Sequence, residues 1–404
     1  MGDYFMVKII HTADLHLGIG SYELYESSYL IQQRFNDFVS NFNFIKEYVI
    51  SSNADFFIIA GDVFHHPRPA VQAYNEFSRI IGDLLKNNIN VIVVLGNHDT
   101  FKTREMLSYI KSFENVNLNN FYLFDEASMI SLKSKDSNEK VNFIGIPYPH
   151  FQSTLRYDEF VQVIERKIND LIQKSEADYN VIVGHLYVEG GKLGSEQRVA
   201  SLKDYPIPKN VFEKENIDLV CLGHLHMPQK LGDKIYYAGS IERIDFGEEN
   251  EEKSFFEINL GSKINVNQIK LKLRPMKTIY IEKDSLVSSL DLTQSLIKFL
   301  NEQKIEEGSL LRIRIKGYGI IKSISRKSIE DYLYEKRKVL AFKIEEIKEE
   351  FKEKEIEFKV SSNIREMLEQ YIYTKYKKEP KEVLEKVKEY SFKIIEEMSS
   401  YEAQ

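Results

Sequence analysis

The stretch VKIIHTADLH, residues 7–16, sets the pattern for most of this chain: an apolar, β-branched run is followed directly by Asp14 and His16. Such a run predicts a buried strand. Four further runs end in the same way, in the clusters Gly61-Asp62-Val63-Phe64-His65, Gly96-Asn97-His98-Asp99, Gly184-His185 and Gly223-His224-Leu225-His226. Because the carboxyl ends of strands in an α/β sheet meet at one rim, we expect these side chains to lie together.

These clusters offer a ligand set for two divalent metal ions. Two like-charged ions about 3.5–4 Å apart need an anion between them, and Asp62 is the central carboxylate. The other ligands divide into Asp14, His16 and His226 for one ion, and Asn97, His185 and His224 for the other. Oxygen and imidazole ligands without thiolate suit manganese, iron or zinc. One isolated Asp-x-His is more often an ordinary core or surface pair, but five such clusters in this order favour a metal centre.

Two histidines remain for the chemistry. His98 follows the expected ligand Asn97, so its ring is predicted to donate a proton to a leaving oxygen or to stabilise charge in a transition state. His65 lies close enough to Asp62 to place a substrate phosphate. Asp99 either orients the imidazole of His98 or caps a turn.

The 404 residues exceed one ordinary domain, which predicts a core domain with appended pieces. A composition with 43% hydrophobic and 29% charged residues is typical of a soluble globular protein, and no apolar stretch approaches the roughly 20 residues that span a bilayer. The first strand begins too early for a signal peptide, and the single cysteine, Cys221, lies in an apolar run, so we expect a reduced cytoplasmic setting. A net charge of −7 excludes nucleic-acid binding through bulk charge and leaves local patches.

The chain divides into four regions by pattern. Alternating strand-like and helical runs in residues 1–273 predict an α/β sandwich of two sheets flanked by helices. Residues 274–325 predict a small α+β domain. Residues 326–362, rich in lysine and glutamate with apolar positions at helical spacing, predict a helical linker. Residues 363–404 predict a helical hairpin.

Two stretches alternate apolar and basic residues, which gives each predicted strand one basic face. The ordinary interpretation is a solvated outer face. The alternative is a route for DNA, in which these side chains contact phosphates and neutralising Arg312 and Arg314 flattens the salt dependence of binding. The basic residues are Lys270, Lys272, Arg274, Arg312, Arg314 and Lys316.

The clusters resemble the calcineurin-like metallophosphoesterase superfamily, whose pattern is D-x-H, G-D-x-x-H, G-N-H-D, G-H and G-H-x-H. Within it, three stretches resemble the double-strand-break repair nucleases, named meiotic recombination eleven in archaea and eukaryotes and SbcD in bacteria. They are HTADLHLG, GDVFHHPRPA and YAGSIERIDFGEENEEKSFFEI. The order of regions is similar too, with a small capping domain followed by helices. The resemblance implies an archaeal member of this family.

The resemblance implies a manganese-dependent DNA endonuclease and 3′-to-5′ exonuclease, in which hydroxide attacks the phosphodiester between two Mn²⁺ ions. It adds Arg68 and the basic faces as DNA contacts, and a cytoplasmic, nucleoid-associated setting. It implies a homodimer with contacts at Tyr74, Leu107 and Ile110.

The resemblance also implies a partner, an SMC-like ABC-type ATPase bound at the base of its coiled coil. The apolar faces of the C-terminal helices suit this role, unless the helices fold back on the capping domain instead. The residues expected at this contact are Leu368, Tyr371, Val387 and Ile394.

Two other functions remain open. The metal motif alone is equally compatible with a phosphoesterase of the same fold that acts on small molecules or phosphoproteins, and the fold also permits a non-catalytic scaffold. The complete ligand set disfavours the scaffold. The third quoted stretch and the extension past residue 273 favour the nuclease, since an enzyme for small molecules seldom needs such an arm.

Overall fold

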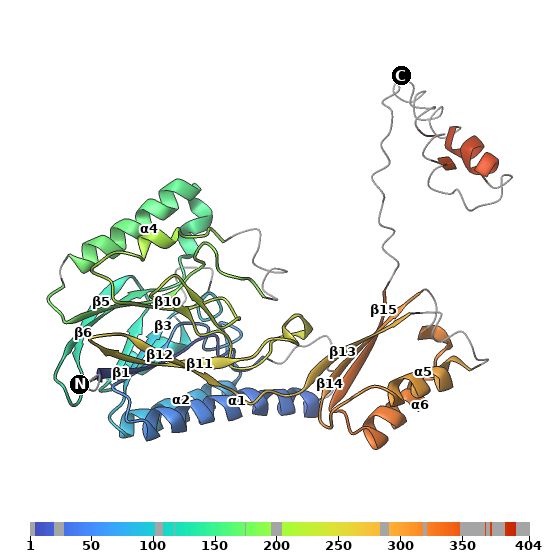
Figure 1. Ribbon diagram of the computed structural model, residues 1–404, viewed down its shortest axis with the longest axis horizontal. Coiled ribbons are helices and arrows are strands. Elements are labelled where there is room, and N and C mark those ends of the chain that lie inside the picture. Colours follow the sequence, from blue (N-terminus) through green and yellow to red (C-terminus); the bar gives the residue numbers. More distant parts are fainter. Residues whose placement is uncertain are drawn as a thin grey trace. The chain divides into compact units, whose positions relative to one another are not determined.

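A computed structural model of the protein describes residues 5–19, 28–101, 108–116, 118–173, 175–194, 204–282, 291–317, 321–347, 368, 372–373 and 384–392 (Figure 1). The chain forms two units, residues 1–347 and residues 348–404. All the strands of the described residues lie in the first unit.

The first sheet has the strand order β12-β11-β1-β2-β3-β4. The strands β1 to β4 run parallel, while β11 pairs antiparallel with β1 and β12 antiparallel with β11. The long helices α1 and α2 connect the parallel strands, as βαβ units require. The elements are β1 (Phe5–Thr12), α1 (Ser28–Ser51), β2 (Phe56–Ile59), α2 (Val71–Lys86), β3 (Asn90–Val94), α3 (Ser112–Asn115), β4 (Phe121–Phe124), β11 (Ser254–Gly261) and β12 (Asn265–Lys270).

The second sheet has the strand order β5-β6-β7-β8-β10-β9. Its central strands β6, β7, β8 and β10 are parallel, and β5 and β9 close the two edges in antiparallel pairs. The elements are β5 (Ser128–Lys133), β6 (Lys140–Ile146), α4 (Tyr157–Ile172), β7 (Tyr179–His185), β8 (Leu219–Gly223), β9 (Gln229–Leu231) and β10 (Ile235–Tyr237).

The two sheets pack face to face over a shared apolar core. Phe56 of β2 meets Phe143 of β6 with ring centroids 4.8 Å apart, and Cys221 of β8 is buried in the same core. Helices α1 and α2 cover the outer face of the first sheet, and α4 covers the outer face of the second (Figure 1). The expected two-sheet α/β sandwich flanked by helices is therefore confirmed.

The small domain after the sandwich has three parallel strands, in the order β13-β14-β15. Its two helices pack on one face of this sheet, where Leu296 and Ile329 meet Ile313 (Figure 1). The elements are β13 (Met276–Glu282), α5 (Leu292–Asn301), β14 (Leu310–Lys316), α6 (Arg326–Asp331), a π-helical turn (Tyr332–Lys336) and β15 (Ala341–Ile347).

The expected helical linker over residues 326–362 is wrong in part. Residues 341–347 form β15 rather than a helix, so the small domain extends past residue 325. Leu340, Ile344 and Ile347 do have helical spacing, but the parallel pairing of β15 with β14 satisfies the backbone and overrides that local preference.

The second unit is described only in part. Residues 368, 372–373 and 384–392 are helical, and the hydroxyl of Tyr373 donates a hydrogen bond to Glu385 across the expected turn. Of the residues expected to bind an ATPase, Leu368 is half-buried and Val387 is exposed, whereas Tyr371 and Ile394 lie outside the described residues. Among the helices described, none combines the length and the apolar character needed to cross a bilayer.

Candidate metal centre

The five sequence clusters converge at the carboxyl ends of β1, β2, β3, β7 and β8. Potential ligand atoms of Asp14, His16 and His226 all lie within 4.8 Å of one another, and so do those of Asp14, Asp62 and His185. These side chains are almost fully buried. The structure thus brings together residues that are up to 212 positions apart in the chain, as their places after buried strands predict.

One half of the centre, called here the His226 half, consists of Asp14, His16 and His226. The Nε2 atoms of His16 and His226 are 3.1 Å apart. Two nitrogen ligands about 2.1 Å from one ion, at nearly a right angle, have a similar separation. The geometry therefore fits one cation between the two rings.

The other half, called here the His224 half, consists of Asn97, His185 and His224. The side-chain oxygen of Asn97 lies 3.0 Å from His185 Nε2 and 3.2 Å from His224 Nδ1. Asp62 reaches both halves, because its Oδ2 is 3.4 Å from His185 Nε2 and 3.7 Å from His16 Nε2. This is the position that an anion between two cations requires.

The ring nitrogens that point away from the centre are held by oxygen atoms. His226 Nδ1 donates to Glu248 at 2.9 Å, and His224 Nε2 donates to Asp204 at 3.0 Å. His185 Nδ1 donates to the Ala60 carbonyl at 2.8 Å. Such partners fix the tautomer and leave the opposite nitrogen to accept a metal.

Sequence reasoning missed Glu248 and Asp204. Neither follows an apolar strand, and each holds a histidine some twenty residues away in the chain. Glu248 does lie within the stretch YAGSIERIDFGEENEEKSFFEI, residues 237–258. This stretch stands out in the sequence, but the sequence alone assigns no role to Glu248.

Four of the expected ligands adopt a strained backbone. Their φ angles are positive, a backbone conformation that residues other than glycine rarely adopt. Strain of this kind costs about 1–3 kcal/mol per residue and persists where the surrounding structure enforces it. The four residues are Asp14 (φ 50°), His16 (φ 42°), Asp62 (φ 51°) and His224 (φ 92°).

Glycines in the motifs allow the close approach of these side chains. A Cβ atom at Gly96 would lie 2.1 Å from Asp62 Oδ1, and one at Gly61 would lie 2.1 Å from His185 Nδ1. Both distances are far inside van der Waals contact. The glycines of G-N-H-D and G-D-x-x-H are therefore required by packing at the centre.

Burial and mutual charge shift the pKa values of these groups. Burial raises the pKa of Asp14, with His185 and His226 opposing. Burial acts in the same direction on Asp62, but His185 and His98 hold its pKa well below the usual range. Burial disfavours protonation of His185, yet Asp62 raises its pKa to about 9. Two buried carboxylates that need nearby positive charge form a donor set that fits divalent cations.

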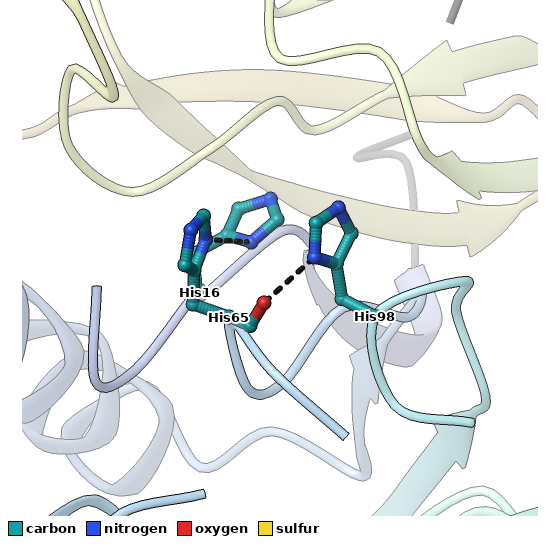
Figure 2. Close-up of side chains that lie close together, drawn as sticks. All are labelled: His16, His65 and His98. Carbon is teal, nitrogen blue, oxygen red and sulfur yellow. Dashed lines mark hydrogen bonds between the residues drawn. The ribbon is translucent and has the colours of Figure 1, made fainter. Parts of the chain in front are cut away.

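The two expected catalytic histidines lie beside His16 (Figure 2). His98 Nδ1 donates to the His65 carbonyl at 2.7 Å, and the two rings stack with centroids 5.3 Å apart. His65 Nδ1 is 3.4 Å from His16 Nδ1. The backbone amide of His98 donates to Asp62 Oδ1 at 2.9 Å, which fixes the imidazole next to the shared carboxylate.

Asp99 braces two turns. Its carboxylate accepts hydrogen bonds from the backbone amides of Phe64 at 3.1 Å and Gly96 at 3.0 Å. Of the two interpretations of Asp99, these contacts support the turn cap over the orientation of His98.

The residues expected to bind DNA make contacts within the chain. Lys270 is exposed and pairs with Glu252, whereas Arg314 pairs with Glu345 at 3.0 Å. Arg312 does not lie on a solvated face, because only 8% of it is exposed and its guanidinium stacks 4.7 Å from the Phe246 ring centroid. The remaining expected contacts are Lys272, which is exposed, Arg68, which lies over the Phe101 ring, Arg274, which pairs with Asp37, and Lys316, which pairs with Glu282.

One of the expected dimer contacts is wrong. Ile110 is fully buried in the domain's own core, so a second copy cannot reach it. Tyr74 is half-buried and its hydroxyl lies 2.6 Å from Ser112 Oγ. Leu107 lies outside the described residues. The exposed apolar neighbours are instead Val71 and Tyr109, with 75% and 47% of their surface exposed.

The chain matches the calcineurin-like phosphoesterase family over residues 7–228. Among solved structures, a dimetal phosphatase from Danio rerio is 10% identical, with a TM-score of 0.42 over 66% of this chain and 97% of that one. Yfce, a phosphoesterase from E. coli, is 15% identical, with a TM-score of 0.28 over 66% of this chain and 100% of that one. At such values the structural likeness adds nothing to the family match.

Proposed function

The chain belongs to the calcineurin-like phosphoesterase family, and within that family we propose that it is a manganese-dependent DNA endonuclease and 3′-to-5′ exonuclease. The observation that carries the proposal is the pair of buried ligand sets that share Asp62. Family and site together support metal-dependent hydrolysis of a phosphoester. Support for DNA as the substrate comes from residues 237–258, a stretch that lies outside the family match over residues 7–228 and resembles the repair nucleases.

Asp62, Asp14, His16 and His226 would hold one ion, and Asp62 with Asn97, His185 and His224 the other. Two divalent ions, which we propose to be Mn²⁺, would when bound supply a nucleophile from water at neutral pH and offset the charge of the phosphate. The residues of the chain hold this arrangement rigid before substrate binds, since the ligand side chains are fixed by backbone and carboxylate partners.

His98 is the residue proposed to protonate the leaving oxygen. Its Nδ1 hydrogen is donated to the His65 carbonyl, so Nε2 is the ring atom from which His98 would transfer a proton. His65, whose ring stacks on His98, places the DNA backbone. Replacing His65 by serine should therefore impair exonuclease digestion more than endonuclease nicking.

The proposal is tested by incubating the full chain with Mn²⁺ and three substrates: linear duplex DNA, circular single-stranded DNA and a small aryl phosphodiester. We expect both DNAs to be cleaved, with no cleavage by Asp62→Asn. Glu252→Gln is the matched control, because Glu252 lies on the surface. Hydrolysis of the aryl compound with intact DNA would favour the alternative, a phosphoesterase for small molecules or phosphoproteins.

We also propose that the chain forms a homodimer through the surface around Tyr74. Because Ile110 is buried, we place the contact at the exposed side chains of Val71 and Tyr109 instead. A dimer in which two identical surfaces pair about a two-fold axis is the commonest assembly. Light scattering at micromolar concentration should report a dimer that Val71→Asp/Tyr109→Asp converts to a monomer. A monomeric wild-type chain would contradict the proposal.

A coiled-coil ABC-type ATPase is the proposed partner of the C-terminal helices. The exposed Val387 is available to a partner helix, and the half-buried Leu368 lies on the other helical segment. Leu368→Asp/Val387→Asp should abolish co-elution with the ATPase while Mn²⁺-dependent hydrolysis remains. Unchanged co-elution would place the contact elsewhere.

A further inference from the structure

A buried network of charged groups lies directly behind His226. The side chains of Glu248 and Lys253 are both 0% exposed, and Lys253 Nζ is 2.8 Å from Glu248 Oε2. Lys253 also donates to Glu251 at 2.7 Å. The second carboxylate oxygen of Glu248 accepts the Nδ1 hydrogen of His226.

The network holds His226 at two points. Glu248 fixes the ring through Nδ1, while Lys253 donates to the His226 carbonyl oxygen at 2.9 Å. The amide of Ser240 donates to the same carbonyl at 3.1 Å. Both the rotation of the imidazole and the position of its backbone are therefore restrained, with Nε2 directed at His16.

Stability alone does not explain this network. Replacing a buried ion pair by apolar groups of similar volume is often neutral or stabilising, because burial of the charges offsets most of their attraction. Glu248 and Lys253 lie against a metal-ligand candidate, and partners of this kind raise metal affinity by orienting the ligand.

We infer that Glu248, with Lys253, is a positioning residue for His226 and sets how tightly the His226 half of the centre holds its ion. The inference rests on the metal centre of the proposed function and is independent of its substrate. A wild-type chain that binds two ions and leaves DNA intact would contradict the proposed nuclease activity but not this inference.

The test measures Mn²⁺ binding by the metal-free full chain with isothermal titration calorimetry. Glu248→Gln should weaken one of the two ions by about 10–100-fold and leave the other unchanged. Glu252→Gln is the control, because it makes the same change of charge four residues away at a side chain that is 67% exposed and pairs with Lys270. This variant should bind both ions as the wild type does. Wild-type affinities for Glu248→Gln would overturn the inference, and so would an equal loss in Glu252→Gln.

Two further measurements separate positioning from a general loss of stability. In electron paramagnetic resonance, at a Mn²⁺ concentration that fills both positions of the wild type, Glu248→Gln should show a single-ion spectrum. A merely destabilised protein would keep the coupled two-ion signal in its folded fraction, and that result would overturn the inference. If Glu248→Gln does not fold, the variant Glu248→Gln/Lys253→Met replaces it, because it removes both buried charges together. Wild-type Mn²⁺ affinities in that double variant would also overturn the inference.

Discussion

Each half of the metal centre combines two histidines with one oxygen-bearing side chain, but the two halves hold one of their histidines in different ways. In the His226 half the bracing carboxylate, Glu248, is fully buried and faces the ammonium of Lys253. In the His224 half the carboxylate is Asp204, 10% exposed, and the Tyr148 hydroxyl and Gln152 amide donate to it. One brace is a buried ion pair and the other is a set of neutral donors near the surface.

This difference predicts unequal affinities within one centre. A ligand that is fixed before the ion arrives loses less freedom on binding. Because the ring and the carbonyl of His226 are both restrained, we expect the His226 half to load first. The small domain contributes to this rigidity, since Arg312 donates to the Phe246 carbonyl two residues before Glu248.

The largest expected effect comes from a change at Asp62, which should affect both halves of the centre alike. Asp62 Oδ2 faces ligands of both, so Asp62→Asn should release both ions and lower hydrolysis by at least about 10³-fold. Metal analysis of the purified variant, together with an aryl phosphodiester assay, measures both losses. Retention of one ion at wild-type affinity would show that the halves do not share this carboxylate.

A second prediction concerns a residue that belongs to neither half. His98→Leu should bind two ions as the wild type does, because the hydrogen bond from His98 to Asp62 comes from the backbone amide, which the substitution keeps. Cleavage should fall by about 10²–10⁴-fold, the usual contribution of a general acid. Calorimetry and DNA cleavage by the same preparation give the two values, and near-normal turnover would remove the assignment.

The comparison is sharpened by the counterpart of Glu248. Asp204→Asn should weaken the ion of the His224 half by about 10-fold, at the lower end of the range for such partners, because Asp204 lies nearer the surface. The affinity in the His226 half should remain unchanged. If calorimetry shows Asp204→Asn and Glu248→Gln weakening the same ion, the division into halves is wrong.

The last prediction concerns the stability of the fold rather than the affinity for metal. His11 on β1 is fully buried against Phe256, and burial lowers its pKa to about 3. Its neutral form is the folded form, so below about pH 6.5 the unfolded chain binds the extra proton and stability falls as the pH falls towards 3.

His11→Phe should therefore lose less stability on acidification. Between pH 6.5 and pH 5 the wild type should lose about 2 kcal/mol more of its free energy of unfolding than the variant does. Urea denaturation of the metal-free proteins at both pH values measures the difference. Parallel losses would show that His11 does not titrate in this range.

The sequence predicted what depends on local pattern. Asp14, Asn97 and His185 were predicted to lie near one another because each follows or ends a β-branched run, and the ends of neighbouring strands meet. Glu248 and Asp204 were not found, since hydrogen bonds to distant histidines leave no periodic signal in the chain.

Tertiary contacts account for the errors as well. Ile110 looked like a surface contact, but an apolar residue on a short helix gives no indication of whether its own core or a partner buries it. β15 looked helical because its lysine and two glutamates hide the pattern of a strand, which is stabilised by its neighbour β14. In both cases the deciding partner is far away in the sequence.

The positive φ angles at Asp14, His16, Asp62 and His224 lower the free energy of unfolding of the protein, because the folded state carries their backbone strain. Glycine would occupy these backbone positions without strain, but it has no side chain to bind a metal. At these four positions, low backbone strain and metal binding therefore favour different residues, so glycine substitutions would relieve strain only by removing the expected ligands.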